Sequence, residues 1–307
     1  MKKPVKTSVI SVIVFTAALF VIYSCLNLSH RNITDNISEN WLGVSDDTQD
    51  VSEYYIDQDL SDIQIQWNSG DVSVSSYDES DVMITETSDE SLQIKQHLSY
   101  RVENGTLYIS NGDTTESSLF HLSNPEVSCE VYIPSDMMQE DGNSLAIKTS
   151  QADVQIVQLS IPSLSVTTES GSVALENVSA GRLSVSTASG SVSSDSGTSD
   201  VIECTTQSGS IGITDTVNDL ILKSTSGEIT IAPAKIFMRA DISSNSGNIY
   251  LSVPKNNGLK MNIQNGSGSF DCELDVSSSN GYYIYKNGKI PLNIKTNSGD
   301  IEVYDAD

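Results

Sequence analysis

The sequence contains few of the residues from which metal, cofactor and catalytic sites are usually built. Among its 307 residues are only three histidines and four cysteines, with no CxxC pair or other metal-ligand spacing. These residues are His30, His97, His121, Cys25, Cys129, Cys204 and Cys272. We therefore predict no catalytic residues, no cofactor-binding residues and no metal ligands, and we expect that the protein is not an enzyme.

Positive charge is also scarce. The chain has 16 Lys and Arg residues against 41 Asp and Glu residues, which gives a net charge of −25. So acidic a protein would repel phosphate groups, which argues against binding to DNA, RNA or an anionic membrane surface. Solubility is the simplest use of this charge. The alternative is the capture of cationic molecules, such as a cationic peptide or divalent ions.

A long apolar run lies near the N-terminus. Residues 8–28 (SVISVIVFTAALFVIYSCLNL) carry no charge, are about long enough for one bilayer crossing, and follow three lysines. The positive-inside rule predicts that residues 1–28 are a cytoplasmic basic tip and a membrane anchor or signal sequence. The rest of the chain is then a single-pass ectodomain outside the cell membrane. Residues 29–50 are polar and are predicted to be a linker.

Three interpretations of this N-terminal segment remain open. An uncleaved signal anchor is the simplest one. Residues 22–25 (IYSC) resemble a lipobox, which would place a lipid anchor on Cys25. Cleavage and secretion is the third interpretation. All three place residues 30–307 outside the cytoplasm.

A short polar motif recurs in the second half of the chain. TESGSV, TASGSV and TQSGSI begin at residues 168, 187 and 206, with intervals of 19 residues. When the Gly of each SG pair is the reference, successive intervals are 19, 19, 18, 20, 21 and 31 residues. The reference glycines are Gly171, Gly190, Gly209, Gly227, Gly247, Gly268 and Gly299. A degenerate copy places Ala152 at the Gly position, and WNSGDVSV carries an isolated Gly70.

Apolar residues hold fixed positions around each reference glycine. The positions seven and five residues before it, and two and four residues after it, are apolar in nearly every copy. This period of two predicts two short strands joined at a Gly corner. One strand pair cannot bury its own apolar face, but equivalent strands stacked about 4.8 Å apart can. The corner requires Gly either because the chain needs a backbone conformation there that a Cβ would obstruct, or because neighbouring coils approach closely.

The predicted fold is all-β, a single elongated parallel β-solenoid with coils of about 19 residues, preceded by one N-terminal transmembrane helix. Right-handed coiling is expected from the preference of parallel crossovers. Residues 145–307 are predicted to form the regular repeats. Residues 51–144 are predicted to be an irregular β region of the same solenoid, with a hairpin turn at Asn104-Gly105.

Three of the cysteines alternate with apolar residues. Cys204 and Cys272 occupy apolar positions of the repeat, and Cys129 alternates with Val127 and Val131. We predict that all three are buried as small hydrophobic residues. An odd number in different columns makes a disulfide framework unexpected.

The repeat is interrupted once, by residues 277–291 (SSSNGYYIYKNGKIP). Asn287-Gly288 predicts a hairpin turn in this segment. Its aromatic residues are Tyr282, Tyr283 and Tyr285. Two roles remain open: the hairpin covers the open end of the solenoid, where exposed strand edges invite aggregation, or its aromatic side chains bind a partner.

The stretch VYIPSDMMQEDGNSLAIKTSQADVQI, the repeated L-x-V-x-T-x-S-G-x-V pattern and a final TNSGDIEV resemble a bacterial family of β-strand-repeat domains of unknown function, whose members are candidate adhesins. The resemblance covers roughly residues 52–307. It implies a solenoid outside the membrane without a catalytic residue set. Members with an N-terminal membrane anchor are similar to proteins encoded with envelope-stress systems of Gram-positive bacteria.

Three function classes remain. The first, which we expect, is a membrane-anchored, non-catalytic binding or adhesin-like module of the cell envelope, whose partner is an envelope protein, a glycan or a cationic peptide. The second is a purely structural spacer or stalk. The third is an enzyme acting on polysaccharides, which needs paired carboxylates on stacked coils. Asp and Glu do not recur in one column, and the outward positions carry no aromatic stripe on which sugars could stack.

Overall fold

The computed structural model describes residues 50–112 and 126–306, within a compact unit that spans Thr48–Asp307. The predicted membrane segment, residues 8–28, lies outside the described residues. Across the two described ranges, no helix is long and apolar enough to span a membrane. Every regular element in these ranges is a β-strand, which confirms the all-β class.

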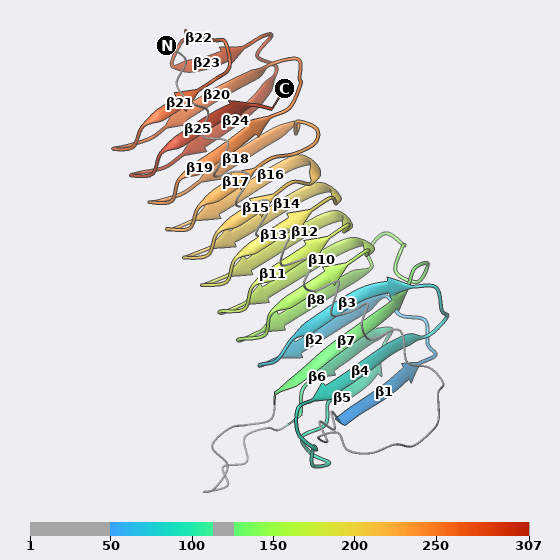
Figure 1. Cartoon of the computed structure of the whole chain (residues 1–307). Helices are drawn as coiled ribbons and strands as arrows, with labels where there is room; N and C mark the ends of the chain where they lie inside the picture. The colour runs from blue at the N-terminus through green and yellow to red at the C-terminus, as the bar shows by residue number, and fades with distance from the viewer. Residues whose placement is uncertain (1–49, 113–125, 307) are drawn as a thin grey trace, which may run out of the picture. The chain divides into compact units, whose positions relative to one another are not determined.

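The strands form two sheets, called sheet A and sheet B here, in which successive strands stack side by side (Figure 1). In spatial order, the 12 strands of sheet A are β1 (Asp50–Ile56), β4 (Val82–Ser88), β7 (Val127–Pro134), β3 (Val72–Tyr77), β9 (Val154–Val157), β11 (Val173–Glu176), β13 (Val192–Asp195), β15 (Ile211–Ile213), β17 (Ile229–Ile231), β19 (Ile249–Val253), β25 (Ile301–Asp305) and β21 (Phe270–Cys272). The 13 strands of sheet B are β22 (Val276–Ser279), β23 (Tyr282–Tyr285), β20 (Leu259–Gln264), β24 (Ile290–Lys295), β18 (Arg239–Ser243), β16 (Thr216–Ser224), β14 (Thr198–Thr206), β12 (Ser179–Thr187), β10 (Ser160–Thr168), β8 (Ser144–Thr149), β2 (Asp62–Trp67), β6 (Thr106–Ser110) and β5 (Ser99–Glu103).

Each regular coil contributes one strand to sheet B and the following strand to sheet A. Equivalent strands of neighbouring coils pair in parallel, so that β10 and β12 align Leu164 with Leu183 and Val166 with Val185. The apolar positions of the repeat face inward and form one hydrophobic core between the sheets. These parallel stacks confirm the predicted repeat fold, and the handedness of the coil stays a prediction.

At both ends of the stack, the spatial order of the coils departs from their order in the chain. The β2–β3 coil lies between the β6–β7 and β8–β9 coils, so Gly70 is the corner of a stacked coil and is not isolated. The last coil, β24–β25, is inserted between the β18–β19 and β20–β21 coils. Accordingly Gly299 packs on Gly247, and Gly268 packs on Gly299. The repeat specifies which positions of two neighbouring coils align. Because the copies are similar, it does not specify which coils are neighbours.

The corner glycines are required by the close approach of successive coils. A Cβ on Gly209 would lie only 1.9 Å from the carbonyl oxygen of Gly190. The Gly209 N–H donates to the Thr206 hydroxyl at 3.0 Å, and Gly190 makes the same bond to Thr187 at 2.9 Å. Of the two explanations that the sequence offered for these glycines, close approach is the one observed.

The strands that precede the regular repeats include antiparallel pairs beside the parallel pairs β2–β6 and β3–β7. β1 pairs with β4, and β4 pairs with β7, both in antiparallel orientation. β5 and β6 form the predicted hairpin, and its turn residues Asn104 and Gly105 have φ values of 53° and 79°. The Asn-Gly turn prediction is therefore confirmed at this position.

A second hairpin lies at the opposite end of sheet B, where β22 pairs with β23 (Figure 1). Its turn is Asn280-Gly281, with φ values of 51° and 81°. The predicted hairpin at Asn287-Gly288 is wrong: the chain turns there, with the Gly288 N–H donating to the Tyr285 carbonyl, but β20 lies between β23 and β24, so these two strands do not pair. Both Asn-Gly pairs suit a tight turn, and the pairing of the flanking strands decides between them.

The second hairpin covers the end of the core. The ring of Tyr283 lies 4.8 Å from that of Phe270, centroid to centroid, so a side chain of sheet B contacts the last strand of sheet A. Tyr283 and Tyr285 both pack against the core. The ammonium group of Lys260 lies 4.1 Å from the centroid of the Tyr282 ring. These contacts favour the capping role of residues 277–291.

Candidate functional site

The strands of sheet B bend at the same place in four successive coils. In β10, Ile161 faces inward, and the next inward-facing residue is Leu164, three positions later. In a flat strand, inward-facing residues recur every two positions. Pro162 of β10 and Gly181 of β12 are left out of the pairing between these two strands. The next two pairs of strands pass over Asp200 and Asn218 in the same way. An extra residue of this kind bends a strand and interrupts its pairing locally.

The bend forms a groove of about 400 Å³ on the outside of sheet B. Two rows of residues cross it, each with one residue from β10, β12, β14 and β16. The hydroxyl ladder is Ser160, Ser179, Thr198 and Thr216, and the bend row is Pro162, Gly181, Asp200 and Asn218. The segment between β7 and β8 adds Gln139 and Asp141 to the lining.

Hydrogen bonds hold two sides of this groove in place. The Gln139 side-chain amide donates to the carbonyl of Ser160 at 3.1 Å, which fixes the β7–β8 segment against β10. The Asn218 amide donates to the Asp200 carboxylate at 2.9 Å, across two neighbouring strands. The groove is therefore built before any ligand enters it.

Two hydroxyls of the groove are free to bind. Ser179 and Thr198 are exposed, and their side chains make no hydrogen bond to the described part of the chain. Ser199 also lines the groove; it is 3% exposed, and its Oγ has no hydrogen-bond partner in residues 50–112 and 126–306. Its neighbours in the inward column are Ala180 and Val217, which are apolar. The Ser199 hydroxyl therefore faces the core and is not available to a ligand in the groove.

A buried carboxylate lies beside the ladder. Asp215 directly precedes Thr216 and is 1% exposed. It accepts the Ser194 hydroxyl at 2.5 Å and the Gly197 N–H at 2.8 Å. Burial raises the pKa of Asp215, and these two hydrogen bonds offset part of the rise. Because both contacts join neighbouring coils, Asp215 serves the corner of the fold rather than the groove.

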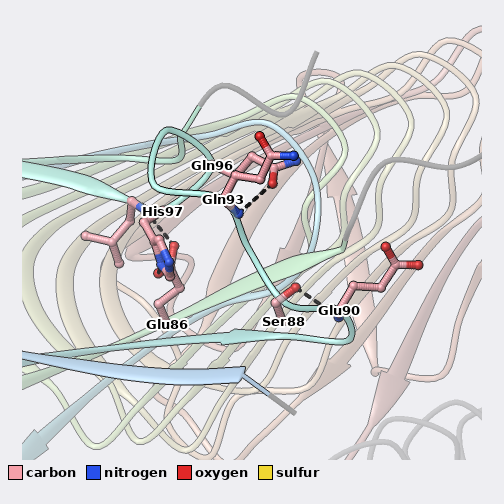
Figure 2. Close-up of polar contacts among 7 residues, drawn as sticks. Glu86, Ser88, Glu90, Gln93, Gln96 and His97 are labelled. Carbon is pink, nitrogen blue, oxygen red and sulfur yellow. Dashed lines mark hydrogen bonds and ion pairs between the residues drawn. The ribbon is translucent and has the colours of Figure 1, made fainter. Parts of the chain in front are cut away.

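A second buried carboxylate lies in β4. Glu86 faces inward and is 1% exposed; its carboxylate lies 2.7 Å from Nδ1 of His97 and accepts the Leu98 N–H at 2.5 Å (Figure 2). Burial, followed by the negative charge of Glu86, raises the pKa of Tyr54. The contacts hold the segment between β4 and β5 on the sheet, so this cluster also has a structural role.

The three cysteines differ in exposure. Cys129 and Cys204 are buried, as predicted, and burial raises the pKa of Cys204 to about 12. The prediction that Cys272 is buried is wrong: it is half-buried, because β21 is the terminal strand of sheet A. All three are free thiols. Among the described residues, no group of three or more His, Cys, Asp and Glu side chains could hold a metal ion.

The groove was not predicted, although its hydroxyl ladder has a regular signal in the sequence. Ser160, Ser179, Thr198 and Thr216 each stand eleven residues before a reference glycine. Alternation of polar and apolar residues predicts that such a column faces outward. It does not predict the bend that places this column in a concave surface.

Comparison with known families identifies the family of this chain. Residues 59–304 match the Toastrack DUF4097 family. The chain belongs to this family. The predicted resemblance to a family of β-strand-repeat domains of unknown function is thereby confirmed. A search of curated proteins found no significant match.

Two solved structures share the Toastrack fold of this chain. A candidate lipid-binding protein from Parabacteroides distasonis ATCC 8503 is 17% identical, with a TM-score of 0.54, over 84% of this chain and 97% of that protein. A candidate adhesin from Bacteroides fragilis NCTC 9343 is 14% identical, with a TM-score of 0.50, over 83% of this chain and 97% of that protein. At this level of identity the likeness concerns the fold alone.

Proposed function

We propose that this Toastrack protein is a non-catalytic, adhesin-like binding module of the cell envelope. Residues 8–28 anchor it in the membrane, and its two sheets lie outside the cell. The observation that carries the proposal is the groove of sheet B, in which four successive coils present a hydroxyl group in register. A preformed concave surface with a few convergent polar groups is typical of binding sites.

The N-terminal sequence supports the location. Three lysines precede the uncharged run of residues 8–28, and the rest of the chain is strongly acidic. The positive-inside rule then favours an extracytoplasmic position for the sheets. An association with envelope stress rests on the family resemblance of anchored members and belongs to the same proposal.

The chemistry of the groove suits holding a ligand. Hydroxyl and amide groups, which donate and accept hydrogen bonds, dominate its polar lining. Of its two carboxylates, that of Asp200 accepts a hydrogen bond from Asn218, which favours a positioning role over a general acid. We therefore assign recognition, and no reaction, to this surface.

A matched pair of variants on one strand tests the proposal. Ser179 and Ser186 are both exposed on β12, but only Ser179 lines the groove. Ser179→Arg fills the groove with a long side chain, and Ser186→Arg adds the same charge outside it. The full-length wild type and each variant are cross-linked to the envelope of intact cells, and the captured components are identified.

The expected result is that the wild type and Ser186→Arg capture the same envelope component and that Ser179→Arg loses it. Equal capture by all three proteins would remove the groove from the function. If none of them captures an envelope component, the protein is a spacer or stalk. Proteolysis of intact cells tests the location independently: an added protease digests the ectodomain if it lies outside and leaves it whole if it lies inside.

A further inference from the structure

We infer that two copies of this chain associate end to end, with β5 of one copy paired to β5 of the other and β1 paired to β1. This inference goes beyond the proposed function and does not involve the groove. Three features of one end of the stack lead to it: two open strand edges, side chains that face the core but are exposed, and a self-complementary pair of charges on β5.

The two open edges lie side by side at the end of the stack that contains β1 and β5 (Figure 1). Among the described strands, β1 is the terminal strand of sheet A and β5 is the terminal strand of sheet B. The ring centroids of Tyr54 in β1 and Tyr100 in β5 lie 5.4 Å apart, so the two strands end the same core. An open edge presents backbone N–H and C=O groups with which another strand can pair.

Side chains that face the core are left exposed at this end. Tyr100 and Val102 of β5 lie opposite Ile109 and Leu107 of β6, which are buried, so all four point to the inside of the stack. Tyr100 is nevertheless 43% exposed, because no further coil covers it. At the other end of the stack, the β22–β23 hairpin covers the core. A second copy would cover Tyr100 as one coil covers the next within the chain.

Exposed apolar side chains are concentrated at the same end. Within residues 50–112 and 126–306, five large hydrophobic side chains are exposed. Four of them lie in β1, in β5 or in the segment between β4 and β5: Val51, Tyr55, Ile94 and Tyr100. Contiguous apolar surface of this kind marks an interface. A lipid surface would also cover these side chains, but it would leave the backbone groups of both edges unpaired.

The presence of two edges favours a second copy over other partners. Stacked sheets lie about 10 Å apart, so a partner that pairs with both edges needs two open edges at that separation. A second copy has them. A two-fold axis perpendicular to the sheets makes both strand pairs antiparallel and keeps the inner face of each sheet inside. A single extended peptide pairs with one edge and leaves the other open.

The charges on β5 select the register of the pairing. Arg101 and Glu103 lie on the outer face of β5, and their side chains are 60% and 58% exposed. In an antiparallel pair centred on Val102, Arg101 of each copy lies opposite Glu103 of the other, which gives two attractive pairs. A pair centred on Arg101 places two arginines opposite each other, which is unfavourable. Exposed ion pairs are weak, so these charges fix the register while the edges and the apolar side chains supply most of the affinity.

The experiment measures the mass of the full-length protein in detergent by analytical ultracentrifugation over a range of concentrations. The wild type should form a dimer that tightens between about 0.01 and 0.1 M salt, because salt screens the repulsion between two copies of net charge −25. Arg101→Glu and Glu103→Arg should each weaken the dimer by at least about tenfold, because each places like charges opposite each other. The double variant, Arg101→Glu with Glu103→Arg, should restore it.

Arg182→Glu is the matched control. Arg182 pairs with Glu203 at 2.8 Å in the regular part of sheet B, and its side chain is 56% exposed, close to the exposure of Arg101. This variant should leave the dimer unchanged, and melting temperatures show whether each variant is folded. Val102→Cys gives a second readout. Mild oxidation should join two copies through a disulfide at this position, because the register places the two side chains opposite each other.

Four results would overturn the inference. They are a wild type that stays monomeric at every concentration and salt, a dimer that both charge reversals leave intact, a double variant that does not recover the dimer, and a dimer of Val102→Cys that forms no disulfide at this position. The second and fourth would assign the dimer to another surface, and the third would show that the charges do not meet across the interface. The capture assay with Ser179→Arg tests the groove separately.

Discussion

A close backbone contact between two coils makes Gly209→Ala a sharp test of the stacking. The added Cβ would lie 1.9 Å from the carbonyl oxygen of Gly190, and contacts under 3.0 Å are essentially never made by a real Cβ. The two coils must separate locally by about 1 Å, the difference between these distances. Because the obstacle is backbone rather than a movable side chain, we expect a loss near the upper end of the usual cost of overpacking, about 3 kcal/mol.

Gly212→Ala is the matched control. Gly212 stands three residues later in the same coil, and a Cβ there would meet nothing within 4 Å. It should leave stability unchanged or raise it by less than about 1 kcal/mol, because Ala restricts the unfolded chain. Both variants are compared with the wild type by thermal unfolding, where each kcal/mol shifts the midpoint by about 2–4 °C. Equal midpoints for Gly209→Ala and Gly212→Ala would refute the close approach of the coils.

Three further predictions concern buried polar groups, thiols and the cap. Because the pKa of Asp215 is raised in the folded state, this residue contributes less to stability as the pH rises from the ordinary pKa of Asp through the raised one. The stability of Asp215→Asn relative to wild type should therefore increase over that pH range, as measured by unfolding curves at several pH values. A constant difference between the two proteins would contradict this assignment. A bulky thiol reagent should modify Cys272 in the native protein before Cys204, and the reverse order, read by mass spectrometry, would show that β21 is covered. Tyr283→Ser removes the contact with Phe270 and should cost about 1–3 kcal/mol, less than the loss of a fully buried aromatic, because Tyr283 is half-buried; an unchanged melting temperature would reject the capping role.

The columns of the stack could be predicted from the sequence because each is a periodic signal repeated in many copies. Val166, Val185 and Cys204 occupy the same position relative to their corner glycines, and the structure aligns them in one inward column. Burial on a two-residue period and a recurrent Gly are local properties, so a single chain displays them directly.

Three other features of the fold could not be predicted, because each depends on a choice between similar alternatives. The neighbours of Gly299 could not be predicted, since every coil offers an equivalent surface for stacking. The choice between Asn280 and Asn287 as turn residues depends on which strands pair, and both pairs have suitable chemistry. The groove depends on an extra residue, such as Pro162, that interrupts the pairing, and the alternation of neighbouring residues does not reveal the bend that results.

The hydroxyl ladder exists only if the strands of neighbouring coils lie in register. This stacking is tested most directly where the spatial order of the coils differs from their order in the chain. Asp241 aligns with Asn293, whose amide donates to its carboxylate at 2.5 Å, whereas stacking in chain order would align it with Asn262. Neighbouring strands lie about 4.8 Å apart, within reach of a disulfide, and second neighbours lie at about twice that distance, beyond it. The measurement is disulfide mapping by mass spectrometry after mild oxidation of two double variants. Asp241→Cys with Asn293→Cys should form the bridge, and Asp241→Cys with Asn262→Cys should not. A bridge in the second variant and none in the first would contradict the stacking on which the account depends.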